Sequence, residues 1–266
     1  MADELPRALG LIGAFLRANL LKILEYRSNF AIGAAAIMMR HVIGLLTLWV
    51  VFAHTRALGR WEPLQVVYMY GYMSLVVAIW HVLLANTLRV EFLVRDAGFD
   101  RYLVRPLPPL FQLMFYYFDD DAIGDFIPAL ACLGIASARL DVAYTPATVL
   151  VFALGLVGGV LIHFGIQLLL SAWSFWHVKS RALLNLFSEM RRFGDYPLDI
   201  FPVTVQWLLT VVVPIGFAGF FPAAEVLSPA SFAWIAWLSL PVGLGVVALG
   251  SAVWHAGLAS YQSAGS

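Results

Sequence analysis

The sequence is poor in charge. Only 12% of its 266 residues are Asp, Glu, Lys or Arg, whereas 62% are hydrophobic, and the mean hydropathy is +0.85. A soluble domain carries about 25% charged and about 45–50% apolar residues. Because 16 basic residues balance 16 acidic ones, no excess of positive charge indicates a nucleic-acid partner. The composition therefore predicts an integral membrane protein.

Cysteine and lysine are also scarce. The single cysteine, Cys132, excludes an intrachain disulfide and a Cys-rich metal site. Neither lysine, Lys22 or Lys179, follows a glycine, so the chain has no nucleotide-binding P-loop. A His-Glu-x-x-His zinc motif and a Gly-x-Ser-x-Gly nucleophile elbow are missing as well. We therefore expect no catalytic residue, metal or cofactor in this chain.

Long apolar runs are what the sequence does contain. A helix crosses the hydrocarbon of a bilayer with about 20 mostly apolar residues. Six stretches meet or nearly meet this length, and they are residues 29–53, 64–88, 122–138, 147–173, 203–221 and 231–255. The third is short, and Pro214 interrupts the fifth. We predict an all-α membrane domain over residues 1–266 with six spans.

The basic residues predict the orientation of these spans. Arg56, Arg60 and Arg139 fall on one side of the membrane, and Arg40 lies within the first span. The other side receives twelve, namely Arg7, Arg17, Lys22, Arg27, Arg89, Arg95, Arg101, Arg105, Lys179, Arg181, Arg191 and Arg192. Because cytoplasmic loops are rich in Lys and Arg, both termini are expected in the cytoplasm. The segment Met1–Glu4 lacks the basic start of a cleaved signal peptide.

The segment before the first span is amphipathic. Apolar residues recur at helical spacing, at Leu9, Ile12, Leu16, Leu20 and Ile23. We predict a helix over residues 8–28 that lies in the cytoplasmic interface and contacts lipid. The alternative is an N-terminal extension of the first span.

Several polar residues fall inside the predicted spans. An arginine at the centre of a span costs about 2.5–3.5 kcal/mol on insertion scales, so such residues are functional candidates. The pathway candidates are Arg40, His41, Tyr72, His81 and His163. The alternative is structural: ion pairs, close packing beside small residues, or, for Tyr72 with its neighbours Tyr68, Tyr70 and Trp61, an interfacial aromatic belt.

Two further groups lie at span ends. The acidic cluster Asp119, Asp120, Asp121 and Asp125 precedes the third span. It either forms a solvated helix start that complements the helix dipole, attracts a cationic substrate, or pairs with loop arginines. Pro214 and Pro222 are gate candidates, because they suit a short re-entrant element at the outer end, which needs a cover of protein or water.

The loop between the second and third spans, residues 92–114, carries a distinctive run. It reads Gly98-Phe-Asp-Arg-Tyr-Leu-Val-Arg-Pro-Leu-Pro-Pro-Leu-Phe-Gln112. This run resembles the cytoplasmic loop of ABC-2 type exporter permeases, in particular the six-span subfamily that includes viologen and multidrug exporters. Residues 174–176, 196–201 and 221–223 extend the resemblance along the chain.

The resemblance implies a permease subunit of an ATP-binding cassette exporter with a type V-like fold. It would lie in the bacterial inner membrane and pair with a second copy or a different homologous permease. A separate dimeric ATPase subunit would hold ATP and Mg. The loop would dock on that ATPase through a coupling helix, and its expected contacts are Arg95, Asp96, Phe99, Asp100, Arg101, Tyr102, Arg105 and Pro106.

Two other functions compete with this interpretation. A secondary transporter would use Arg40 and the aspartates for ion coupling, although six spans without an internal repeat make that less favourable. A membrane-embedded enzyme acting on lipid or peptide would use His81, His163 and the acidic cluster, and would need them at a common depth.

Overall fold

The computed structural model describes residues 27–116, 119, 121–177, 181–229 and 231–261, together with positions 13, 21, 24 and 25. In this part of the chain the regular structure is helical, and β pairing is limited to an isolated bridge between Leu58 and Trp61. The predicted all-α fold is confirmed. The expected interfacial helix over residues 8–28 lies almost entirely outside the described residues.

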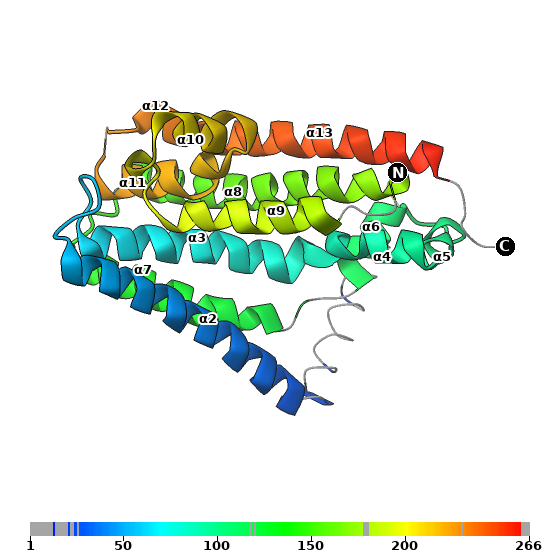
Figure 1. Ribbon diagram of the computed structural model, residues 1–266, viewed down its shortest axis with the longest axis horizontal. Coiled ribbons are helices and arrows are strands. Elements are labelled where there is room, and N and C mark those ends of the chain that lie inside the picture. The colour runs from blue at the N-terminus through cyan, green and yellow to red at the C-terminus, as the bar shows by residue number, and fades with distance from the viewer. Residues whose placement is uncertain are drawn as a thin grey trace.

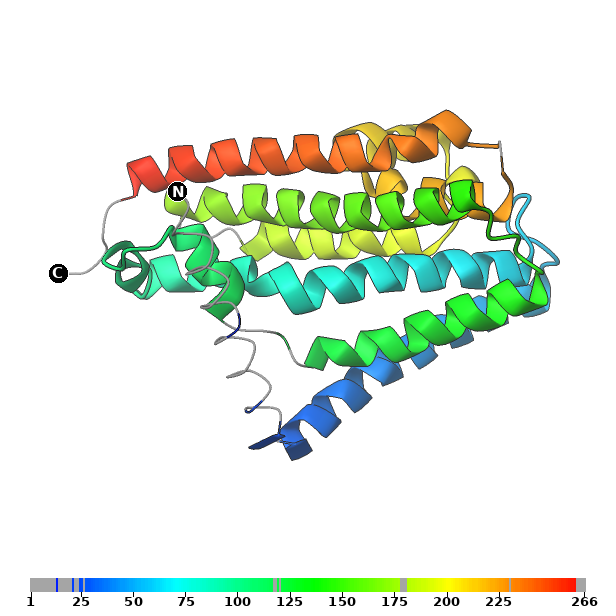
Figure 2. The same ribbon diagram turned by 180° about the vertical axis from the view of Figure 1, so that it is seen from behind.

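Five described helices are long and apolar enough to cross a membrane. They are α2 (Arg27–His54), α3 (Pro63–Leu84) with its continuation η1 (Ala85–Arg89) and α4 (Val90–Arg95), η2 (Asp121–Asp125) with α7 (Phe126–Arg139), α8 (Pro146–Ala172) with η3 (Trp173–Phe175), and α12 (Ala233–Trp237) with α13 (Ser239–Ser260). Figures 1 and 2 show these helices side by side, with α2 splayed away from the others toward its first residues.

The bundle has two distinct ends. One carries α4, the short helix α5 (Asp100–Leu103) and α6 (Pro109–Tyr116), and we call it the α5 end (Figure 1). The opposite end carries the loop between α2 and α3, and we call it the Trp61 end. Both α3 and α8 begin at the Trp61 end, where the hydroxyls of Tyr68 and Tyr144 lie 3.3 Å apart.

Glycines let α8 and α13 pack in close contact. A Cβ atom on Gly158 would lie 2.4 Å from the carbonyl of Ser239, and one on Gly250 would lie 2.5 Å from the carbonyl oxygen of Gly165. Small residues at such positions allow two backbones to approach within a membrane. The pairing of Gly158 with Ser239 and of Gly165 with Gly250 shows that the two helices run parallel, from the Trp61 end to the α5 end.

The fifth crossing differs from the prediction. Because α8 ends at the α5 end and α13 begins at the Trp61 end, the chain between them must return. The return follows α9 (Arg181–Arg191), η4 (Arg192–Asp195) and η5 (Leu198–Ile200). A Cβ on Gly194 would lie 2.7 Å from Met73, midway along α3. At the Trp61 end, Asp199 accepts a hydrogen bond of 2.9 Å from the indole of Trp61.

The expected fifth span, residues 203–221, is therefore corrected to a re-entrant element. It comprises α10 (Val203–Trp207) with the π-helix η6 (Leu208–Val212), and η7 (Gly216–Phe220) with α11 (Phe221–Leu227), two halves bent by 80°. It enters beside Asp199 and leaves near Trp61, whose ring lies 5.9 Å from that of Phe220. Both ends of the element thus lie at the Trp61 end, and hydropathy alone does not separate such a loop from a crossing.

Candidate functional site

A cluster of ionisable side chains lies between α2, α3 and η2. Asp125 is 1% exposed, and its Oδ1 accepts hydrogen bonds from Arg40 Nη2 at 2.6 Å and His41 Nε2 at 2.7 Å. The other ring nitrogen of His41 lies 2.8 Å from the hydroxyl of Tyr70. Arg40 remains half exposed. One buried carboxylate thus satisfies two neighbouring side chains of α2, as buried charges require.

His81 extends this cluster along α3. Its Nδ1 lies 3.7 Å from Asp125 Oδ2, and its Nε2 lies 3.5 Å from Asp119 Oδ2. We call the group formed by Arg40, His41, Tyr70, His81, Asp119 and Asp125 the Asp125 cluster. No three His, Cys, Asp or Glu side chains in the described part of the chain are arranged to hold a metal ion.

The interpretation of the acidic cluster as a solvated helix start is wrong for Asp125, which is buried and paired. Asp119 is about one-third exposed and faces His81. Asp120 and the side chain of Asp121 lie outside the described part of the chain. No sequence pattern indicates the partners of Asp125, because Arg40 and His41 are more than 80 residues away along the chain.

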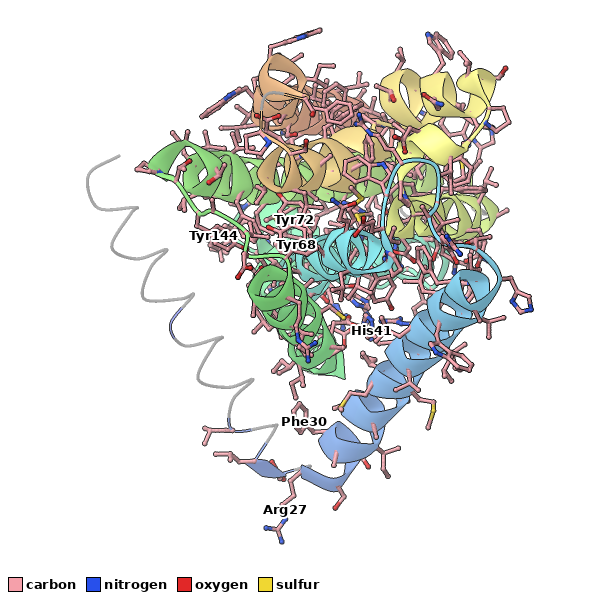
Figure 3. The ribbon with its side chains drawn as sticks, turned by 90° about the vertical axis from the view of Figure 1, so that its left-hand side faces the viewer. Arg27, Phe30, His41, Tyr68, Tyr72 and Tyr144 are labelled. Atoms are coloured by element: carbon pink, nitrogen blue, oxygen red, sulfur yellow. The ribbon has the colours of Figure 1, made fainter. Side chains whose placement is uncertain are left out.

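The tyrosines of α3 also differ from one expectation. Tyr68, Tyr70 and Tyr72 are at most 6% exposed, so the aromatic-belt interpretation is wrong for them. Tyr72 donates a hydrogen bond to the carbonyl of Phe152 on α8. Figure 3, viewed from the Trp61 end, shows Tyr68 and Tyr72 within the bundle near Tyr144, and His41 on the side of α2 that faces the bundle.

A cavity of about 550 Å³ borders the Asp125 cluster. Its lining includes Arg40, His41, Tyr70 and Asp125 on one side, and Ser188, Arg191, Arg192, Asp195 and Tyr196 from α9 and η4 on the other. A second, more apolar cavity of about 590 Å³ adjoins it, because Arg192 and Tyr196 line both. The amphipathic α9 therefore turns its polar face toward the charged residues of α2 and η2. Of the candidates predicted from the sequence, Arg40, His41 and Asp125 line the first cavity.

His163 is placed elsewhere, in the interior of the bundle. It is fully buried on α8, with Nδ1 2.8 Å from the carbonyl oxygen of Gly159. Its ring packs against Trp80 and Phe187 at centroid distances of 5.7 and 6.0 Å. The close packing expected beside small residues is found on the face of α8 that carries His163, since a Cβ on Gly159 would lie 2.5 Å from the carbonyl oxygen of Ala218. His163 is thus a packed core residue and does not line the cavity.

An aromatic group anchors the short helix α5. Phe99, just before α5, has no exposed surface. Its ring contacts those of Tyr102, Phe175, Trp254 and Tyr261, at centroid distances between 5.2 and 6.1 Å. We call these five residues the Phe99 box. It joins α5 to η3 and to the end of α13.

A polar contact reinforces the Phe99 box. The hydroxyl of Tyr261 donates a hydrogen bond of 2.9 Å to Asp100. Burial, together with this hydrogen bond, raises the pKa of Tyr261 to about 12. The hydroxyl therefore stays protonated at neutral pH and keeps donating to Asp100. Asp100 and Tyr261 hold α5 to the C-terminal end of α13.

The expected coupling residues separate into two groups. Phe99 and Tyr102 are buried within this chain, so the expectation that they contact a partner is corrected: they anchor α5 from inside. Asp100 is half-buried. The exposed members of the set are Arg95, Asp96, Arg101, Arg105 and Pro106. Between them lie two apolar residues that sequence reasoning missed, Leu103 (43% exposed) and Val104 (83% exposed).

The two gate candidates both belong to the re-entrant element. Pro214 lies at the break between its halves, where the missing N–H of proline and its fixed backbone angle interrupt a helix. Pro222 is buried in α11, and a Cβ on Gly155 of α8 would lie 2.5 Å from it. The second half of the element, η7 and α11, therefore packs closely on α8 and is covered by protein, as non-helical backbone at membrane depth requires, whereas the first half exposes Trp207 and Val211.

Comparison with known proteins gives one result. No curated protein and no solved structure matches the chain. A family of membrane proteins described as "ABC-2 family transporter protein" does match, over residues 38–265. The match includes the Asp125 cluster, α5 and the re-entrant element. The chain therefore belongs to the ABC-2 family of transporter membrane proteins.

Proposed function

We propose that this chain is one permease subunit of an ATP-driven exporter, powered by a separate ATPase that docks on the α5 end. A second permease, identical or homologous, completes the pathway. The proposal places the protein in a bacterial inner membrane with the α5 end and both termini in the cytoplasm. The substrate class suggested by the resemblance is small drugs or viologens.

The observation that carries the proposal is the exposed surface at the α5 end. Leu103, Val104 and Arg105 lie side by side in the sequence and are all exposed. Apolar residues flanked by arginines are typical of the centre and rim of a protein–protein contact. Since the sequence contains no P-loop, ATP-driven transport through this chain would need a partner that binds ATP.

The Phe99 box gives this surface a mechanical link to the spans. A partner that moves α5 also moves the ends of α8 and α13, because Phe99 packs on Phe175 and Trp254. The close glycine packing between α8 and α13 makes them a stiff pair. A ligand shifts a conformational equilibrium only through its different affinity for the two states. We propose that the ATP-bound and ATP-free ATPase differ in the position in which they hold α5.

The charged cavity supports a pathway shared between two subunits. Arg40 is half exposed midway along α2. An arginine at this depth does not face lipid without a cost of about 2.5–3.5 kcal/mol or more. We propose that α2 and α9 face the second permease across a hydrated space, so that each chain supplies one wall of the pathway.

The test is purification of the tagged full-length chain from its own membranes in mild detergent. We expect a P-loop ATPase to accompany it and to hydrolyse ATP. Val104→Asp and Arg105→Glu should reduce the amount of ATPase recovered with the chain, because they change the exposed surface without touching the Phe99 box. Arg56→Glu is the matched control, since Arg56 is exposed at the opposite end.

Two results would contradict the proposal. One is recovery of the wild-type chain without any ATPase under conditions that keep it folded. The other is transport by the purified chain in proteoliposomes that needs an ion gradient and no ATP, which would favour a secondary transporter.

A further inference from the structure

Two buried polar atoms face each other in the Asp125 cluster. Asp125 Oδ2 and His81 Nδ1 are shielded from solvent, and within the described part of the chain neither has a hydrogen-bond partner. They lie 3.7 Å apart. Buried polar atoms without partners are rare in native proteins and call for an explanation. A proton on His81 Nδ1 would supply the missing donor for Asp125 Oδ2.

These atoms belong to a continuous series of titratable groups. It runs from Asp119 to His81 (3.5 Å), from His81 to Asp125 (3.7 Å), from Asp125 to His41 (2.7 Å) and from His41 to Tyr70 (2.8 Å). Asp119 is the exposed member, with 36% of its side chain accessible. Histidine ordinarily titrates between about pH 5 and pH 8. A proton therefore has a route from the surface to the buried carboxylate.

The same carboxylate holds α2 in place. Only 11% of the most apolar part of α2 is buried. Most of its contacts are made with η2, and two close approaches mark the stretch from Ala34 to Gly44: a Cβ on Gly124 would lie 2.9 Å from the carbonyl oxygen of Ala34, and one on Gly44 would lie 2.8 Å from the hydroxyl of Tyr70. The bonds of Asp125 to Arg40 and His41 lie in this stretch. A change in the charge around Asp125 therefore acts on the main attachment of α2.

Other charged groups surround His81 and Asp125, and they determine whether a proton there strengthens or weakens the attachment of α2. Arg40 and His41 approach from α2, Tyr70 from α3, and Asp119 from the segment before η2. Across the cavity, α9 and η4 contribute Arg191, Arg192 and Asp195. The carboxylates of Asp119 and Asp125 lie 3.5 and 3.7 Å from the ring nitrogens of His81.

We propose that His81 and Asp125 form a proton-binding site that controls the attachment of α2 beside the cavity. One proton converts the His81 imidazole to imidazolium, which attracts Asp125 Oδ2 toward α3. The charge of the carboxylate is then shared between His81 and the α2 residues, and the positive charges of His81 and Arg40 repel each other. Arg40 is half exposed and turns into the cavity, so α2 loosens.

The test measures the position of α2 by electron paramagnetic resonance. Spin labels at Ile32→Cys on α2 and Ile127→Cys on α7, both exposed positions, are combined with Cys132→Ala. The labelled full-length chain in nanodiscs is mixed with excess unlabelled chain, so that only distances within one chain are measured. Between about pH 8 and about pH 5 we expect the distribution to shift to longer distances and to broaden.

Substitutions identify the proton site. His81→Gln should abolish the pH-dependent shift and keep the short distance, whereas Asp125→Asn should give the long distance at every pH. His255→Gln is the control, because His255 is exposed on α13, and it should retain the shift. The proposal is overturned if the wild-type distance does not change with pH, or if His81→Gln keeps the shift while His41→Gln removes it.

Discussion

Replacing Phe99 by alanine should release α5 from the spans. The Phe99 side chain is completely buried and contacts four other aromatic rings. Truncating a buried phenylalanine to alanine costs about 3–5 kcal/mol. Because each 1.4 kcal/mol changes an equilibrium about tenfold, the population in which α5 is detached should rise by a factor of about a hundred or more.

Limited proteolysis with trypsin measures this population. The bond between Arg101 and Tyr102 lies in α5, and the backbone must leave its helical conformation to be cleaved. When opening and closing are fast, the cleavage rate follows the equilibrium population of the open form. We therefore expect the rate at this bond to rise about a hundredfold or more in Phe99→Ala.

Two variants make the result specific. Leu103 lies in the same helix but is exposed. Leu103→Ala should therefore change the free energy of detaching α5 by no more than about 0.5 kcal/mol. Phe99→Leu keeps much of the volume and should give an intermediate rate. Cleavage of Phe99→Ala at the wild-type rate would refute the role of the Phe99 box in holding α5.

Three further substitutions test the packing. Gly158→Ala should lower the melting temperature of the purified chain, since overpacking costs about 1–3 kcal/mol, whereas Gly134→Ala meets open space and should not; equal effects would contradict the close packing. Asp125→Asn should destabilise the chain by about 3 kcal/mol, the lower end for breaking a buried pair, because one partner is half exposed. Asp141→Asn, in an exposed loop, is its control, and a silent Asp125→Asn would count against the cluster. Trp61→Phe removes an indole hydrogen bond to a carboxylate and should cost about 1.5–3 kcal/mol in chemical unfolding; no change would exclude that contact.

Hydropathy identified the spans whose residues are apolar on every side. It failed between residues 181 and 227, and the failure has a physical cause. In α9 and the first residue of η4 one face carries Ser188, Glu189 and Arg192, which lowers the mean hydropathy of a segment that nevertheless crosses the bundle. The following segment is apolar but bends by 80°. Pro214 was the available signal for that bend, and the direction of the chain after it depends on tertiary packing.

The candidate site was predictable in composition but not in arrangement. An arginine within the first span and an acidic cluster before the third each indicated a polar site, yet only the fold shows that Asp125 is the residue that binds Arg40 and His41. Likewise, an aromatic residue in a loop suits either a partner contact or an internal anchor. The structure shows that Phe99 is the internal anchor and that Val104 is the exposed residue. The sequence alone could not distinguish them, because it does not specify which side of a four-residue helix faces the bundle.

The most direct test of the central claim is site-specific photo-crosslinking in the native membrane. A photoreactive amino acid replaces Val104 at the α5 end, and in a second variant it replaces Tyr144, which is 47% exposed at the Trp61 end. We expect the Val104 position to form an adduct with a P-loop ATPase and the Tyr144 position to form none. Absence of the adduct at Val104, or its appearance at Tyr144, would contradict the account of this chain as the membrane half of an ATP-driven exporter.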